Sequence, residues 1–160
     1  MKKLLLSAFF LLGTFAVNAQ TANDMIELLK SDVKTNRKAI ITESMAFTEA
    51  ESKAFWPVYN EFEIEMEKLA NKRIQNIKDY AANYDKMTDE KADQLIKAAF
   101  DFKSSRIKLN ESYYNKFAKV LSPTRAAKYM QIEDQIQLLI DLSIASELPL
   151  VKKPESDAVK

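Results

Sequence analysis

The chain has 160 residues, of which 47% are hydrophobic and 29% are charged, and its formal net charge is +1. A near-neutral balance with both signs interspersed gives no electrostatic basis for nucleic-acid binding. Histidine and cysteine are absent and the single glycine is Gly13, which excludes thiolate and imidazole catalysis, ordinary zinc sites and glycine-rich phosphate loops. The composition therefore predicts an all-helical protein that is not an enzyme and needs no cofactor or metal.

Residues 1–19 have the pattern of a secretory signal peptide. Lys2-Lys3 supplies the positive charge, residues 4–15 form the apolar core, and residues 17–19 end in a small-residue cleavage pattern. The apolar core is shorter than the ~20 residues that a membrane-spanning helix needs. We therefore expect export, most simply to a periplasm, with a mature chain that begins at Gln20 and keeps no stable membrane anchor.

The first helix of the mature chain is expected from about residue 24 to about residue 43. Apolar residues recur there at helical spacing, namely Ile26, Leu29, Val33 and Ile40.

The second helix is expected to begin after Thr48. Thr48 and Glu51 have the spacing of a capping box, and Phe47 stands in the hydrophobic-staple position. Pro57 lies inside the helix, where we expect a kink and no break because the apolar stripe keeps its phase. Ile64 is expected on the polar side. The stripe consists of Phe55, Tyr59, Phe62, Met66, Leu69, Ile77, Tyr80 and Tyr84.

The third helix is expected to begin after Thr88 and to end near Val120. The fourth is expected to begin with Ser122 as N-cap and Pro123 at the first helical position, and to end near Ser146. Its predicted buried stripe is Tyr129, Ile132, Ile136, Leu139 and Ile140.

The domain organisation follows from these four segments. Residues 20–148 are expected to form a single all-helical domain, and residues 149–160, polar with two prolines, a flexible tail. Because the long second and third helices are separated by only a few residues around 85–87, they predict a long antiparallel hairpin and an elongated molecule.

The third helix carries two apolar stripes where a simple hairpin needs one. The second stripe can be covered by the first or fourth helix, by a second copy of the chain, or by a bound protein, and a dimer is expected. The first stripe holds Leu95, Ala99, Phe102, Leu109, Tyr113, Phe117 and Val120, and the second holds Ile96, Phe100, Ile107, Tyr114 and Leu121.

Charged residues in unusual positions have structural interpretations. Arg73 and Arg106 lie in line with apolar stripes and are expected to cover them with their stems or to pair with an acid across the hairpin. Four glutamates in the range 61–67 suggest a hard-cation site, but on a helix they fall on different faces and predict a solvated surface.

Two short segments resemble the helix-starting motif of the Spy/CpxP-like periplasmic proteins, the LTxxQ family. One segment is residues 47–51 and the other is residues 121–125; each has an apolar residue followed by a hydroxyl N-cap, with Glu51 and Arg125 in place of the final Gln. The motif residues are Phe47, Thr48, Glu51, Leu121, Ser122, Pro123 and Arg125.

The resemblance implies a cradle-shaped dimer that holds unfolded or envelope proteins without ATP, or that adapts the response to envelope stress. The family's metal-sensing members use His or Cys ligands, which this chain lacks. The residues expected to bind a client or partner are Trp56, Ile96, Phe100, Lys103, Ile107 and Tyr114. The alternative is a regulatory module that docks on a periplasmic sensor or envelope complex without general chaperone activity.

Overall fold

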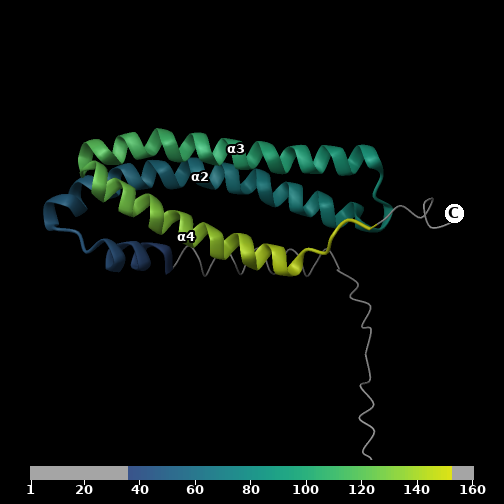
Figure 1. Cartoon of the computed structure of the whole chain (residues 1–160), viewed down its shortest axis with the longest axis horizontal. Coiled ribbons are helices and arrows are strands. Elements are labelled where there is room, and N and C mark those ends of the chain that lie inside the picture. The colour runs from purple at the N-terminus through teal and green to yellow at the C-terminus, as the bar shows by residue number, and fades with distance from the viewer. Residues whose placement is uncertain (1–35, 153–160) are drawn as a thin grey trace, which may run out of the picture.

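The computed structural model describes residues 36–152, and the regular elements in this range are all helical. Helical residues 36–45 precede α2 (Glu49–Asn83), the 3-10 turn η1 (Tyr84–Lys86), α3 (Asp89–Val120) and α4 (Pro123–Glu147). Figure 1 shows α2 and α3 antiparallel and side by side, with α4 returning along the pair. The predicted all-α class is confirmed, while the predicted signal peptide and the start of the first helix lie outside the described residues.

Side-chain caps set the helix starts, as the sequence predicts. At α2, the Thr48 hydroxyl accepts from the backbone N–H of Glu51 at 3.2 Å, and the Glu51 carboxylate accepts from the Thr48 backbone N–H at 2.9 Å. The hydroxyls of Thr88 and Ser122 cap α3 and α4 in the same way. α2 runs through Pro57 without a break.

The first helix ends at residue 45, two residues beyond the predicted end near Glu43. Ala46 follows with φ 45°, in the left-handed region, and its N–H donates to the Thr42 carbonyl at 3.1 Å. Glycine is the usual residue in this conformation, and a side-chain-bearing residue pays about 1 kcal/mol for it. The spacing of apolar residues could not predict the end of this helix, because the left-handed conformation of Ala46 defines it.

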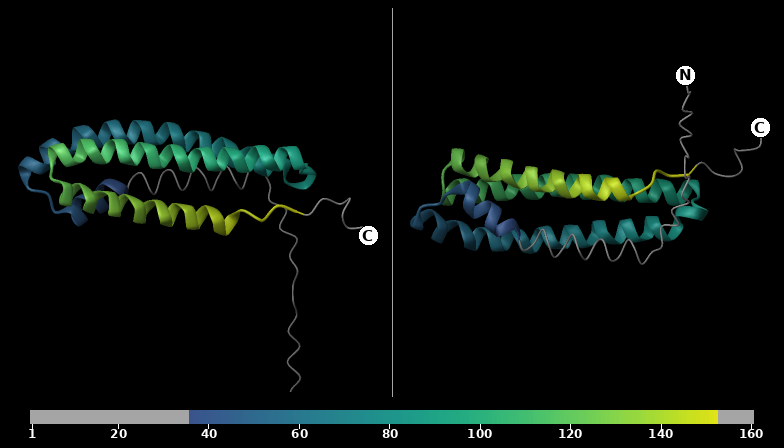
Figure 2. Two further views of the ribbon diagram at one scale, coloured as in Figure 1. Left: turned by 45° about the horizontal axis from the view of Figure 1, so that its top comes forward. Right: turned by 90° about the horizontal axis from the view of Figure 1, so that it is seen from below.

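The main core lies at the end of the bundle where α2 and α4 begin, and helical residues 36–45 (dark blue) lie at the same end (Figure 2). Aromatic rings dominate it: the centroids of Phe55 and Phe117 are 5.1 Å apart, and those of Phe117 and Tyr129 are 4.6 Å apart. Such pairs contribute about 0.5–1.5 kcal/mol beyond their burial. The cluster comprises Ile41, Met45, Phe55, Tyr59, Phe62, Met66, Tyr113, Phe117, Ala126, Tyr129, Ile132 and Ile136.

The inward face of α4 differs from the predicted stripe. Leu139 is 66% exposed, whereas Glu133 and Gln137 are buried. The inward face of α4 also carries polar side chains that meet arginines of neighbouring elements: Glu133 accepts from Arg37 and Asp141 accepts from Arg73. The Gln137 amide donates to Asp141. The remaining members of the predicted stripe are buried or packed against the core.

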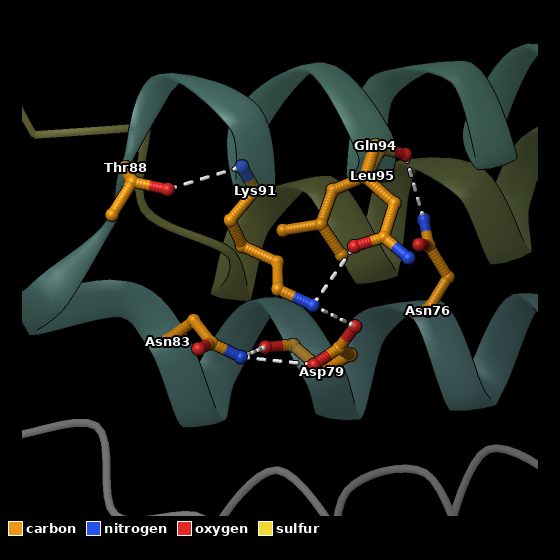
Figure 3. Close-up of polar contacts among 7 residues, drawn as sticks. All are labelled: Asn76, Asp79, Asn83, Thr88, Lys91, Gln94 and Leu95. Atoms are coloured by element: carbon orange, nitrogen blue, oxygen red, sulfur yellow. Dashed lines mark hydrogen bonds and ion pairs between the residues drawn. The ribbon is translucent and has the colours of Figure 1, made fainter.

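Polar contacts close the opposite end of the hairpin (Figure 3). The Asn76 side chain donates to the Leu95 carbonyl at 3.1 Å, and Lys91 lies 3.1 Å from Asp79, so that α2 and α3 are joined across their interface. The Asn83 amide also donates to Asp79. The sequence missed η1, the short 3-10 turn that follows α2.

The chain stays beside the bundle after α4. The Tyr80 hydroxyl donates to the Pro149 carbonyl at 2.6 Å, and the Lys152 ammonium contacts Asp85 and lies 4.6 Å from the centroid of the Tyr84 ring. The beginning of the predicted flexible tail therefore contacts the end of α2 and η1. Residues 153–160 lie outside the described range.

Candidate interaction surfaces

The second apolar stripe of α3 divides into a covered part and an open part. Tyr114 and Leu121 are half-buried and pack against the core cluster. Ile96, Phe100 and Ile107 are 50%, 58% and 57% exposed. Neither α4 nor helical residues 36–45 cover these three side chains. Residues 24–35, the rest of the first helix that was expected to cover them, lie outside the described range.

Exposed leucines of α4 lie on the same side of the α3–α4 pair. Arg106 of α3 and Asp141 of α4 point at each other, with Nη1 and Oδ2 3.4 Å apart. At about 100° per residue, Ile107 is rotated about 100° from Arg106, and Leu138 and Leu142 are rotated about 60° and 100° from Asp141. Seen from one end of the pair, antiparallel helices wind in opposite senses. A rotation of 60–100° from the α3–α4 contact in the chain direction therefore brings Ile107, Leu138 and Leu142 to the same side of the two helices.

We call this surface the α3–α4 outer face and define it by its exposed apolar residues, which are Ile96, Phe100, Ile107, Leu138 and Leu142. Its α3 part runs over twelve residues, from Ile96 to Ile107, and the two ends are about 16 Å apart along the helix axis. The exposed cation Lys103 lies between Phe100 and Ile107 along α3. An exposed apolar patch is typical of a protein–protein contact surface.

Trp56 belongs to a different part of the molecule. It lines an open groove at the junction of helical residues 36–45 and α2, with Phe47, Lys53 and Pro57 among the other lining residues. The Trp56 indole N–H donates to the Ser52 hydroxyl at 3.0 Å, and its ring lies edge-on to Phe47 at 6.2 Å. The structure therefore separates Trp56 from the candidates on α3.

The two motif-like segments meet, and they meet at the positions where they depart from the LTxxQ pattern. Arg125 donates twice to Glu51, with Nε–Oε1 at 2.8 Å and Nη2–Oε2 at 3.0 Å. Its guanidinium also lies 5.6 Å from the centroid of the Phe47 ring. The Thr48 backbone hydrogen bond, followed by the Arg125 contact, lowers the pKa of Glu51. Glu51 and Arg125, the two residues that replace the final Gln of the motif, thus bind each other and join the start of α2 to the start of α4.

A buried polar cluster lies between helical residues 36–45 and α4, and sequence reasoning missed it. Arg37 Nη2 donates to Glu133 Oε1 at 2.8 Å, and their side chains are 12% and 2% exposed. Glu133 Oε2, Arg37 Nε and the Tyr129 hydroxyl are buried without a hydrogen-bond partner among the described residues. Each such group costs about 1–3 kcal/mol.

Burial raises the pKa of the Glu133 carboxyl, against the opposing charges of Arg37 and Arg106. Burial, followed by the Glu133 charge, also raises the pKa of the Tyr129 phenol. Glu133 follows Tyr129 by four residues, and this spacing, which places both on one face of a helix, is the signal that could have revealed the cluster.

Arg73 and Arg106, for which the sequence left two alternatives open, meet in a second charged cluster. Both arginines pair with an acid on α4, Asp141, and not with an acid across the α2–α3 hairpin. Both guanidiniums also lie over the Phe102 ring, at 5.1 and 5.8 Å from its centroid. Partial burial would raise the pKa of Asp141, but hydrogen bonds from Gln137 and Arg73 outweigh it and lower that pKa.

The acidic run in α2 does not converge on one point. Glu61 contacts Lys116 at 3.1 Å, Glu63 lies 3.9 Å from Lys38, and Glu65 contacts Lys68 at 2.6 Å. Over residues 36–152, no group of three or more acidic side chains is placed to hold a metal ion. In the same range, no helix is long and apolar enough to span a bilayer.

Three features are candidate functional sites: the α3–α4 outer face, the Trp56 groove and the buried polar cluster. Comparison of the chain with protein-family models, with curated proteins and with solved structures finds no match.

Proposed function

We propose that the chain is an exported, ATP-independent holdase-type chaperone or envelope-stress adaptor that binds unfolded proteins on its helical surface. The α3–α4 outer face carries this proposal, because it gathers five large exposed apolar side chains on one side of two helices. Unfolded proteins expose apolar side chains, and burying these against the face releases water from both surfaces. Lys103 adds a cation that suits acidic segments of such clients.

Shape and assembly belong to the same proposal. α2 alone is about 52 Å long at 1.5 Å per residue, and we propose an elongated molecule that presents a long binding surface. We also propose a homodimer, in which two copies combine their apolar surfaces into one concave surface. Export to a periplasm places this surface where ATP is not available to drive release.

A matched pair of charge substitutions tests the client-binding role. Ile107→Asp places a charge on the α3–α4 outer face, and Ile64→Asp places the same charge on α2, where the isoleucine is 56% exposed against 57% for Ile107. The measurement is light scattering of a chemically denatured client diluted into buffer without ATP. We expect wild type and the Ile64 variant to suppress aggregation at near-stoichiometric ratios.

The Ile107 variant should need about tenfold more protein for the same suppression, the effect of about 1.4 kcal/mol of lost contact. Equal activity of the two variants would remove the α3–α4 outer face from the mechanism. No suppression by wild type would overturn the holdase function and favour the alternative, a regulatory module that docks on one envelope partner. Sedimentation of wild type and the Ile107 variant tests the dimer.

A further inference from the structure

Helical residues 36–45 cover part of the core through a small set of contacts. Ile41 and Met45 insert fully buried side chains among the aromatic residues of α2 and α4. Lys38 lies 5.7 Å from the centroid of the Tyr59 ring and 3.9 Å from Glu63 of α2. The segment therefore lies against both α2 and α4, and its removal would expose their inner surfaces.

The same segment is held by an interface with poor polar pairing. The segment contributes Arg37 Nε, and α4 contributes Glu133 Oε2 and the Tyr129 hydroxyl, to the buried polar atoms that lack a partner in the described range. Water would hydrogen-bond all three atoms if the segment moved away. Ala46, where the segment joins the rest, is the single residue other than glycine with a positive φ among residues 36–152.

Opening of this segment breaks the Arg37–Glu133 ion pair and exposes Ile41, Met45 and the aromatic side chains beneath them. Hydration of the three polar atoms and relaxation of Ala46 offset part of this cost. α2, α3 and α4 have no comparable joint between them: the contact of α2 with α4 at Glu51 and Arg125 is bidentate. Local opening at such a weak joint can precede global unfolding.

We propose that helical residues 36–45 are a lid that opens while α2, α3 and α4 stay folded, and that its opening uncovers a second client-binding surface on α2 and α4. Phe55, Tyr59 and Tyr129, each almost fully buried in the closed state, form the centre of this surface. Its large aromatic area suits apolar segments of an unfolded chain. This inference rests on the proposed function for the nature of its ligand.

Thiol labelling tests the lid without any client. The chain has no cysteine, so Ile41→Cys and Ile77→Cys each introduce a single thiol. Both isoleucines are buried, but Ile77 lies in α2 outside the main core cluster. We expect the thiol at position 41 to react with a maleimide at least about tenfold faster under native conditions, since it needs only local opening.

Hydrogen exchange of the unsubstituted protein repeats the comparison, with residues 37–45 against the middle of α3, so that a variant that fails to fold does not decide the test. Equal labelling rates and equal exchange would overturn the lid. Ala46→Gly removes the strain of the closed state, and we expect it to slow labelling at position 41 and leave labelling at position 77 unchanged.

The client role of the uncovered surface is tested with the same variant. Ala46→Gly should lower the suppression of client aggregation if the open lid binds clients. A variant that slows labelling but suppresses aggregation as well as wild type would overturn the second surface. The labelling result does not depend on chaperone activity, so failure of the lid and failure of the proposed function give different results.

Discussion

Two glutamate–arginine pairs tie α4 to earlier parts of the chain, and they differ in the direction of their pKa shifts. Both have a shortest N–O distance of 2.8 Å. Glu51 is a quarter exposed, accepts both arms of Arg125 and caps α2 as well. Glu133 is fully buried and accepts one hydrogen bond from Arg37. The pKa of Glu51 is lowered and that of Glu133 is raised. The direction of the pKa shift therefore depends on exposure to water and on the number of hydrogen-bond donors, and not on the N–O distance.

The largest expected effect comes from breaking the buried pair. Arg37→Ala leaves Glu133 buried without its cation and should lower the free energy of unfolding at pH 7 by about 3 kcal/mol. Urea unfolding followed by circular dichroism measures this change. Arg125→Ala is the matched control and should cost less, because Glu51 keeps its Thr48 hydrogen bonds and its contact with water. A larger loss for Arg125→Ala would contradict the comparison.

Replacing both members of the buried pair sharpens the same prediction. The double substitution of Arg37 and Glu133 by methionine removes the unpaired atoms together with the charges and fills a similar volume. We expect it to restore most of the stability that Arg37→Ala loses, since apolar replacement of a buried pair is often neutral or stabilising.

Lowering the pH should change the stability of wild type and of the neutral variant Glu133→Gln by different amounts. Because its pKa is higher in the folded state than in the unfolded state, folding takes up a proton between the folded value and the ordinary value of 4.5. The unfolding free energy of wild type relative to Glu133→Gln should therefore rise as the pH falls from 7 through this window. Urea titrations of both proteins at several pH values measure the difference, and a constant difference would show that the burial of Glu133 has no effect on its titration.

Glu51 should respond to pH in the opposite direction. Its pKa is lowered, so the stability that it contributes is present above the ordinary value of 4.5 and is lost as the pH falls through the folded value. Wild type should lose stability relative to Glu51→Gln over that lower range. The same pH series measures this change, and an unchanged difference below pH 4.5 would indicate that Arg125 and Thr48 do not hold the carboxylate ionised.

The starts of the helices were predictable from the sequence, and the pairing between elements was not. Thr48, Thr88 and Ser122 cap the helices that follow them because a cap depends on neighbours within one turn. The partner of Arg37 lies 96 residues away, and periodicity carries no information about it. The same reasoning explains why the apolar surplus of α3 was visible in the sequence whereas the leucines of α4 that join it on one side, Leu138 and Leu142, were not.

The smallest effect concerns the backbone between the two pairs. Ala46 follows the helical residues that carry Arg37 and precedes the cap of α2 that carries Glu51. Ala46→Gly should raise the free energy of unfolding by about 0.5–1 kcal/mol, since glycine adopts a positive φ without the steric cost of a Cβ atom, less the entropy that glycine adds to the unfolded chain. Ala127→Gly is the control: this exposed alanine lies in the regular helix α4, and glycine there should cost about 1 kcal/mol. Opposite signs for the two substitutions, measured by urea unfolding, would show that the left-handed residue stores strain at the joint between the buried pair and the solvated one, and a loss at both positions would show that it does not.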